Sequence, residues 1–135
     1  MESAELVTLL MQNEAFADAP EDVVVALVEA GEIKTLDPGT VIITEGKQGE
    51  SIWTLLEGEF DVFVEGDLVN RMTEKGEVAG EISAVSLTPA TATVQSSGVA
   101  KAFCIPQQAL HKIMESHPAL AASMLRSMAK YLGRR

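Results

Sequence analysis

Apolar residues recur at helical spacing near both ends of the chain. Leucines three to four residues apart share one face of a first predicted helix, and Pro20 opens a second helix that Gly31 ends. Towards the C-terminus, His117-Pro118 separates two further apolar segments, because the residue before a proline disfavours the helical conformation. The predicted helices cover residues 2–12, 20–30, 106–116 and 119–132.

Between these helices the apolar and polar residues alternate, which is typical of half-buried strands. A glycine stands at nearly every predicted turn, and this regular succession of short strands and turns predicts an antiparallel roll. The predicted strands cover residues 33–36, 40–44, 51–56, 59–64, 67–72, 91–95 and 99–105. We expect the last two strands to pair with each other across residues 96–98. The pattern therefore predicts a mainly β domain with flanking helices, with a β-roll over about 31–105 and C-terminal helices over about 106–132.

The last predicted helix carries an apolar stripe that needs a covering surface. Leu120, Met124 and Met128 lie on this stripe, together with Tyr131 or Leu132. Three alternatives are open. The stripe packs against its own barrel, forms the seam of a dimer, or closes over a bound ligand as a lid.

Length and charge narrow the class of protein. A chain of 135 residues is most simply a single domain, residues 1–135. Its formal net charge of −10 argues against nucleic-acid binding, which needs Lys and Arg to neutralise phosphates. The apolar run at residues 6–11 is too short for a membrane span and lacks the basic flank of a signal peptide. One cysteine excludes an internal disulfide, so we expect a cytoplasmic protein.

No arrangement of residues predicts catalysis or a metal site. His111 and His117 have no third His or Cys at ligand spacing, and no Ser-His-Asp set or Walker loop is visible. Cys104 lies in an apolar segment and Trp53 lies beside an isoleucine on a predicted strand, so both are expected to be packing residues. We therefore expect no catalytic residue, no metal and no cofactor.

Residues 76–94 carry the pattern most specific for ligand binding. An apolar step bracketed by glycines precedes a short predicted helix that begins at Glu81 and ends before Pro89. The N-terminus of such a helix offers unpaired backbone N–H groups to an anion, and Thr91 and Thr93 can add hydroxyl donors. The Glu81 carboxylate can accept hydrogen bonds from the vicinal hydroxyls of a sugar.

The same stretch resembles the phosphate-binding cassette of the cyclic-nucleotide-binding domain family. That cassette reads Phe-Gly-Glu-Leu-Ala-Leu, a short spacer, then Pro-Arg-Thr/Ala-Ala-Thr-Val, and residues 80–83, Pro89 and 91–94 match it in order and spacing. The resemblance covers roughly residues 15–132. It implies a jelly-roll, or double-stranded β-helix, barrel with helices at both ends. Outside the cassette, the matching turn positions are Glu45-Gly46, Gly49, Gly58 and Val62.

The resemblance also implies a ligand, cyclic AMP or cyclic GMP, and the residues that bind it. Glu81 is expected to hold the ribose, and Tyr131 is a candidate lid over the base. The alternative role of Glu81 is a charge in the first turn of the helix that only interacts with the helix dipole. The alternative role of Thr91 is that of an ordinary strand residue without a ligand contact. The residues expected to face the phosphate are Gly80, Ile82, Ser83, Thr91 and Ala92.

One ligand-site position departs from the family pattern. The family has an arginine after the cassette proline, whose guanidinium clamps the cyclic phosphate, and this chain has Ala90 there. Losing a charged hydrogen bond of about 1.5–3 kcal/mol, and leaving a buried phosphate unpaired, predicts an affinity lower by about a hundredfold or more. Arg71 or Lys101 could replace the arginine, although a solvated surface charge is the more usual role. Ala79 and Ala84 also replace bulkier residues of the family.

These observations predict a non-catalytic sensor or regulatory domain that binds a cyclic nucleotide, or a related small anionic ligand, with weakened phosphate recognition. As the resemblance implies, the ligand would reposition the last two helices and change their contacts with a protein partner or in a homodimer. The alternative is a degenerate domain that keeps the roll as a scaffold for protein interaction or dimerisation and binds no nucleotide.

Overall fold

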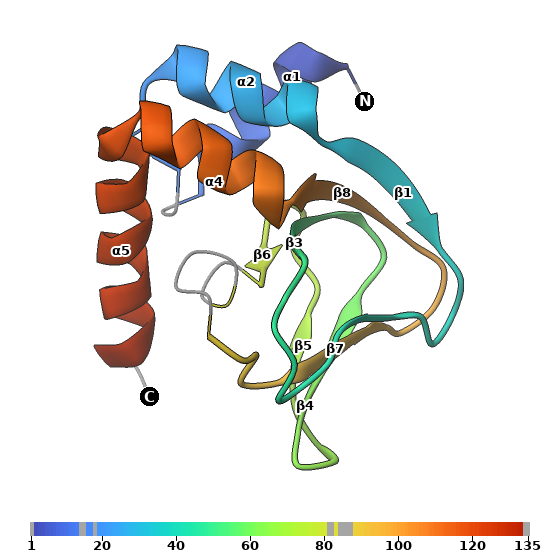
Figure 1. The fold of residues 1–135 in the computed structure, drawn as a ribbon. Helices are drawn as coiled ribbons and strands as arrows, with labels where there is room; N and C mark the ends of the chain where they lie inside the picture. The colour runs from blue at the N-terminus through green and yellow to red at the C-terminus, as the bar shows by residue number, and fades with distance from the viewer. Residues whose placement is uncertain (1, 14–15, 18, 81–82, 84–87, 134–135) are drawn as a thin grey trace.

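The computed structural model of the chain describes residues 2–13, 16–17, 19–80, 83 and 88–133, with side chains of the last helix described as far as residue 126. Its N-terminal part forms α1 (Ser3–Met11) and α2 (Glu21–Ala30), which lie together above the strands (Figure 1). Both helices bury the apolar face that the sequence pattern predicts. Glu21 and Asp22 lie in the first turn of α2, where their negative charges interact favourably with the helix dipole. The prediction of N-terminal helices is confirmed.

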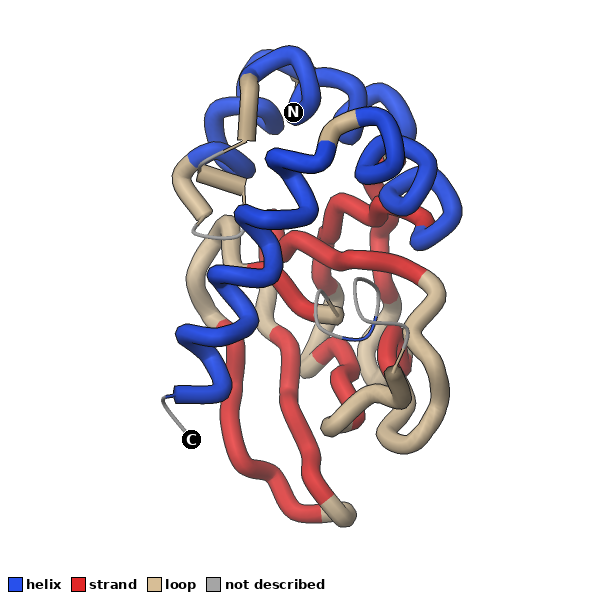
Figure 2. The backbone as a smooth tube through the Cα atoms, turned by 60° about the vertical axis from the view of Figure 1, so that its left-hand side comes forward, coloured by secondary structure: helices blue, strands red, loops and turns tan. Residues whose placement is uncertain are grey.

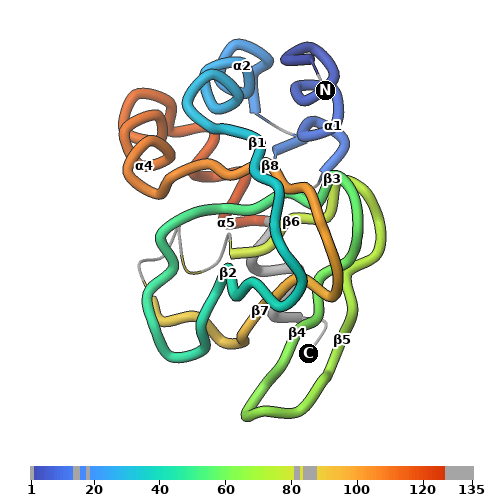
Figure 3. The backbone as a smooth tube through the Cα atoms, turned by 90° about the vertical axis from the view of Figure 1, so that its right-hand side faces the viewer, coloured from blue at the N-terminus to red at the C-terminus, as the bar shows by residue number. Residues whose placement is uncertain are grey.

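The strands form two four-stranded antiparallel sheets that face each other as a roll (Figure 3). One sheet has the order β1-β8-β3-β6 and the other has the order β2-β7-β4-β5. Consecutive strands therefore alternate between the sheets at several points, as in a jelly roll. The predicted fold class is confirmed. The strands are β1 (Glu32–Leu36), β2 (Val41–Ile43), β3 (Ser51–Glu57), β4 (Phe60–Val64), β5 (Asp67–Met72), β6 (Val78–Ala79), β7 (Thr93–Ser96) and β8 (Ala100–Pro106).

The predicted hairpin between the last two strands is wrong. β7 pairs with β2 and β4, whereas β8 pairs with β1 and β3 in the opposite sheet. The Ser96 hydroxyl donates to the Asp37 carbonyl and accepts from the Thr40 N–H, and the Ser97 N–H donates to the Glu59 carbonyl at 2.9 Å. These bonds hold the end of β7 in its own sheet, so the following residues cross to the other sheet instead of turning back.

Two further details of the strands differ from the sequence prediction. β6 has only two residues, which is too short to show an alternating pattern, yet it pairs with Thr54 and Trp53 of β3. The strand expected over 91–95 begins at Thr93, two residues later.

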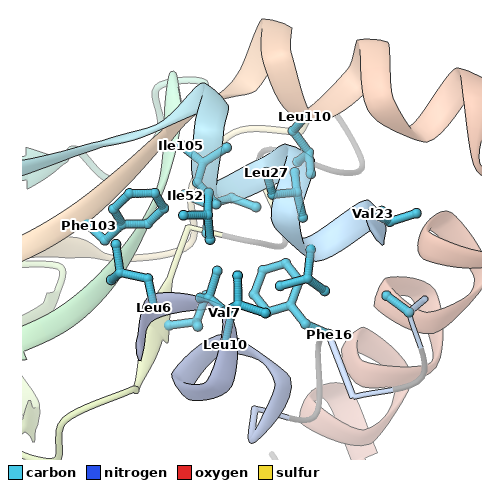
Figure 4. Packing of buried hydrophobic residues seen from close by; sticks show 14 of the residues in the cluster. Leu6, Val7, Leu10, Phe16, Val23, Leu27, Ile52, Phe103, Ile105 and Leu110 are labelled. Atoms are coloured by element: carbon cyan, nitrogen blue, oxygen red, sulfur yellow. The ribbon is translucent and has the colours of Figure 1, made fainter. Parts of the chain in front are cut away.

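Strand β3 separates two apolar cores because its side chains alternate between its faces. Ile52 and Leu56 pack on the helix side, where they join a cluster with α1, α2 and residues of β8 (Figure 4). Trp53 and Leu55 point into the roll and join a second cluster between the two sheets. The first cluster thus holds the helical layer against one sheet, and the second cluster fills the space between the two sheets.

The two C-terminal helices are α4 (Gln107–Ser116) and α5 (Pro118–Gly133). Leu110 of α4, and Leu120 and Met124 of α5, are completely buried in the helix-side cluster. Beyond these residues α5 leaves the helical layer and extends along one side of the roll (Figures 1 and 2). The first half of the predicted apolar stripe therefore packs within its own domain. The side chains of Met128, Tyr131 and Leu132 lie outside the described residues.

Candidate functional site

The cassette, residues 76–94, begins at Gly76, and three hydrogen bonds hold Gly76 and its neighbour Glu77 in place. The Gly76 N–H donates to the Leu55 carbonyl at 2.8 Å, and the Leu55 N–H donates to the Glu77 carbonyl at 2.9 Å. From the helical layer, the Asn13 side-chain amide donates to the Gly76 carbonyl at 3.2 Å. Gly76 has a φ of +98°, and a Cβ there would lie 3.0 Å from Leu9 Cδ1. The entrance of the cassette is thus bonded to β3 and to Asn13, which lies just after α1.

Gly80 follows β6 at a point where a side chain does not fit. Its φ is +88°, which side-chain-bearing residues rarely adopt. An added Cβ would lie 2.8 Å from the Ser51 carbonyl oxygen and 3.1 Å from Ile43 Cδ1. Because the closer neighbour is backbone, it cannot rotate away. Gly80 therefore serves the backbone geometry of the cassette.

Ser83 uses its hydroxyl to fasten the cassette to the turn between β2 and β3. The side chain is buried, its Oγ accepts a hydrogen bond from the Gly49 N–H at 2.8 Å, and its O–H donates to the Thr88 carbonyl at 2.5 Å. A Cβ on Gly49 would lie 3.1 Å from Ser83 Oγ, so a glycine permits this close approach. The hydroxyl that was expected to face the phosphate is bonded within the protein.

The exit of the cassette is paired to the same turn. The Ala90 N–H donates to the Lys47 carbonyl at 2.8 Å, and the Gly46 N–H donates to the Ala90 carbonyl at 2.9 Å. Pro89 forms an isolated β-bridge with Gln48. Residues 46–49 are therefore the scaffold on which the cassette is mounted. The sequence identified them only as a turn, although its two glycines were a signal: Gly46 has a φ of +82°, and Gly49 lies close to Ser83.

The surroundings of Ala90 are apolar. Ala90 is half-buried and packs against the cluster inside the roll, as do the partly buried Ile42 and Val62. The side chain that replaces the family arginine therefore contributes one methyl group to an apolar wall.

The two cations considered as replacements for the arginine are engaged with carboxylates. Arg71 Nε lies 2.7 Å from Asp61 Oδ1 and 3.7 Å from Glu59 Oε2, and the hydrogen bond from Arg71 to Asp61 raises the pKa of the guanidinium. Lys101 Nζ lies 4.0 Å from Glu57 Oε2. Both basic side chains are about half exposed. The expectation that they are solvated surface charges is confirmed.

The other predicted positions are distributed as follows. Thr91 is exposed and Ala92 is half-buried, just before β7 begins. Trp53 and Cys104 are buried in the cluster inside the roll, so the prediction that they are packing residues is confirmed. Glu81, Ile82 and Ala84, and the side chain of the candidate lid Tyr131, lie outside the described residues.

Two features of the described part of the chain bear on the class of site. Its helices include none that combines the length and apolar character needed to cross a membrane. Within the same residues, no three side chains of His, Cys, Asp or Glu are grouped so that they could hold a metal ion.

Comparison with known proteins gives the same family over most of the chain. The sequence model described as the cyclic nucleotide-binding domain matches residues 33–117. A cAMP-dependent protein kinase regulatory subunit from Pyricularia oryzae is 30% identical over 89 residues, which are 65% of this chain and 23% of that protein. The HTH-type transcriptional regulator Cmr from Mycobacterium tuberculosis is 26% identical over 112 residues, which are 81% of this chain and 46% of that protein. The chain thus spans less than half the length of these curated relatives.

Solved structures share the fold at low sequence identity. The sensor domain of the transcriptional regulator DNR from Pseudomonas aeruginosa superposes with a TM-score of 0.79 at 18% identity, covering 98% of this chain and 92% of that domain. The cAMP-bound PfPKA-R superposes with a TM-score of 0.76 at 16% identity, covering 97% of this chain and 45% of that one.

Proposed function

The chain belongs to the cyclic nucleotide-binding domain family, and we propose that it is a non-catalytic regulatory domain that senses a small ligand in the cassette of residues 76–94. The observation that carries this proposal is the frame of the cassette. Gly80 keeps a positive φ, Ser83 bonds to Gly49 and Thr88, and Ala90 pairs with the turn at 46–49. A cassette built in this way supports ligand recognition even though its phosphate-clamping arginine is replaced.

The proposed ligand is a cyclic nucleotide, cyclic AMP or cyclic GMP, or a related small molecule. Glu81 is proposed to hold the ribose, and Gly80, Ile82, Ser83, Thr91 and Ala92 to surround the phosphate position, as the family motif implies. With Ala90 in place of the arginine, phosphate recognition is weaker, by about a hundredfold or more in affinity.

The route from ligand to output is proposed to run through the C-terminal helices. Leu110, Leu120 and Met124 anchor α4 and the first half of α5 in the helix-side cluster. Leu125 of α5 is 55% exposed. A shift of α5 relative to the roll would alter this surface and its contacts with a protein partner or a second copy of the chain. We propose that the domain acts in the cytoplasm, and that regulation is its role in any longer protein.

Titration calorimetry against cyclic AMP and cyclic GMP, up to millimolar concentration, tests the proposal when it is run beside an Ala90→Arg variant. We expect saturable but weak binding by the parent protein and tighter binding by the variant, since the guanidinium restores a charged hydrogen bond. If the parent binds neither cyclic nucleotide and only the variant binds, cyclic-nucleotide sensing is wrong for this chain.

A second function is favoured by the same position. Ala90 turns a methyl group towards an apolar wall, and both of its backbone polar groups are bonded to the neighbouring turn. A roll with no retained ligand can serve as a scaffold for protein interaction or dimerisation. The scaffold requires an oligomer or protein complex that forms without ligand, whereas the sensor requires stabilisation that depends on ligand. Sedimentation analysis with and without ligand separates the two.

A further inference from the structure

We propose that the groove between α1 and α2 is a docking site for a basic amphipathic helix of a partner protein. This inference goes beyond the proposed function, which places partner contacts at the C-terminal helices, and it holds whether or not the cassette binds a ligand. Three features of the described residues support it: the shape of the groove, its charge and the position of Glu29 in α2.

The first feature is an apolar groove that is long enough for about two turns of a helix. α1 and α2 lie side by side at the end of the molecule opposite the β4–β5 hairpin (Figures 1 and 3), and the groove between them has a volume of about 350 Å³. Glu21 and Glu29 both line it, and eight residues of α2 separate them by about 12 Å along the helix axis. Val25, midway between them, is 37% exposed. The apolar lining consists of Ala4, Val7, Val25 and Val28.

The second feature is the charge of this part of the chain. Residues 1–33 contain eight Asp or Glu residues and no Lys, Arg or His, so they carry −8 of the formal net charge of −10. At the groove, Glu21 and Glu29 are exposed, and neither carboxylate forms an ion pair with a described residue. The hydroxyl of Thr8, which also lines the groove, is already used within α1, where it donates to the Ala4 carbonyl at 3.1 Å. Carboxylate acceptors beside apolar side chains favour a cationic occupant, and they repel nucleic acid and anionic membranes.

The third feature is the place of Glu29 within α2. It lies in the last turn of the helix, where a negative charge interacts unfavourably with the helix dipole, and that turn contains no basic residue. A Lys or Arg from a partner would pair with the Glu29 carboxylate and would also approach the negative end of the dipole. Glu29 therefore lowers the stability of the free domain at a position where it favours the binding of a basic helix.

These dimensions specify the pattern of the partner. A helix in the groove presents apolar side chains at positions i, i+3 or i+4, and i+7 to Val25 and its neighbours. Lys or Arg residues about eight positions apart then reach Glu21 and Glu29. The probe is accordingly a peptide of about 18 residues, long enough to form a helix, with leucines on one face and a lysine at each end of the leucine stripe.

The first test titrates the full chain with this peptide and with two controls by calorimetry. One control has the same residues in an order that spreads the leucines around the helix, and the other has glutamate in place of lysine. We expect saturable binding of the designed peptide alone. If the designed peptide does not bind, or if the reordered peptide binds equally well, the inference is wrong.

The second test locates the peptide on the surface with Val25→Ser. Serine has a helix propensity close to that of valine but no apolar side chain to bury, so binding should weaken about tenfold. Val99→Ser is the matched control, because Val99 is 64% exposed and lies outside the helical layer, and it should leave binding unchanged. Binding to Val25→Ser with the affinity of the parent would place the peptide elsewhere and overturn the inference.

The third test uses Glu29→Gln, for which we expect two effects of opposite sign. The substitution should weaken peptide binding about threefold at low salt, because one ion pair is lost. It should also raise the midpoint of thermal unfolding of the free protein by about 1–3 °C, because the unfavourable charge at the end of α2 is removed. Asp67→Asn, which removes the same charge from an exposed residue of the β4–β5 hairpin, should change neither property. Equal weakening by Asp67→Asn would show that net charge alone drives binding and would contradict a docking site at the groove.

Discussion

The two faces of strand β3 show how differently the helical layer and the roll use apolar residues. On the helix side, Ile52 is completely buried, and the surrounding cluster includes large side chains with no exposed surface. On the roll side, Trp53 and Leu55 are also buried, but three residues near the cassette, Ile42, Val62 and Ala90, remain only partly covered. The helix-side cluster also has partly buried residues at its edge, Leu9, Met11, Ile113 and Met114, but only the edge of the roll cluster lies beside the cassette.

Because of this difference, the two sides of β3 are expected to contribute differently to folding stability and to ligand binding. A completely buried side chain contributes its full free energy of apolar burial to folding. A partly covered apolar wall retains surface that a ligand can still bury on binding. Substitutions on the helix side should therefore change mainly the free energy of unfolding, and substitutions around the cassette should change ligand binding as well.

The largest loss of stability is expected from Phe103→Ala. Phe103 is 2% exposed on the helix side of β8, and its ring packs so closely on Gly31 that a Cβ there would lie 2.5 Å from Phe103 Cζ. Removing the ring should lower the free energy of unfolding by about 3–5 kcal/mol. Val62→Ala, on the roll side, should lower it by only about 1 kcal/mol. Urea unfolding of both variants measures the contrast, and equal losses would contradict the expectation that the completely packed ring of Phe103 contributes more to stability than the partly buried Val62.

The next effect is expected from Gly80→Ala. A positive φ costs a side-chain-bearing residue about 1 kcal/mol, and the contact with the Ser51 carbonyl adds to it, for a total of roughly 2–3 kcal/mol. Gly39 also has a positive φ of +78° but no atom within 4 Å of its added Cβ. Gly39→Ala should therefore show the φ cost alone. Thermal unfolding of the two variants separates the clash from the backbone strain, and a smaller loss for Gly80→Ala than for Gly39→Ala contradicts the clash.

These glycines also illustrate how far the sequence predicted the molecule. The helical faces and most strands followed from periodicity, because burial on one face leaves a regular pattern. The sheet partners of β7 did not follow, since hydrogen bonds from Ser96 and Ser97 to distant residues decide them. For the cassette, the motif predicted the position of Gly80. It did not predict that the Ser83 hydroxyl bonds to Gly49, because that bond depends on a contact 34 residues away.

A third prediction concerns the buried hydroxyls of Ser83 and Ser96, which should affect stability equally but ligand binding differently. Ser83→Ala would leave the Gly49 N–H without its partner and should lower the free energy of unfolding by about 1–3 kcal/mol. Ser96→Ala removes an equivalent pair of bonds, to Asp37 and Thr40, and should have a loss of the same size. Only Ser83→Ala should also weaken ligand binding in calorimetry, because Ser83 lies in the cassette. Equal effects of both variants on binding would show that the hydroxyl acts through global stability.

The smallest effect is expected at Thr54, and its sign is the opposite. Thr54 lies on β3 between Ile52 and Leu56, is completely buried, and its Oγ1 has no hydrogen-bond partner among the described residues. A buried hydroxyl without a partner keeps its desolvation penalty, whereas valine has nearly the same shape and no polar atom. Thr54→Val should therefore raise the free energy of unfolding by up to about 1 kcal/mol and leave ligand affinity unchanged. Thr54→Ser, which keeps the hydroxyl and removes a methyl group, should lower stability instead. A destabilised Thr54→Val protein in urea unfolding would show that the hydroxyl is bonded, and that the helix-side core depends on a polar contact as the cassette does.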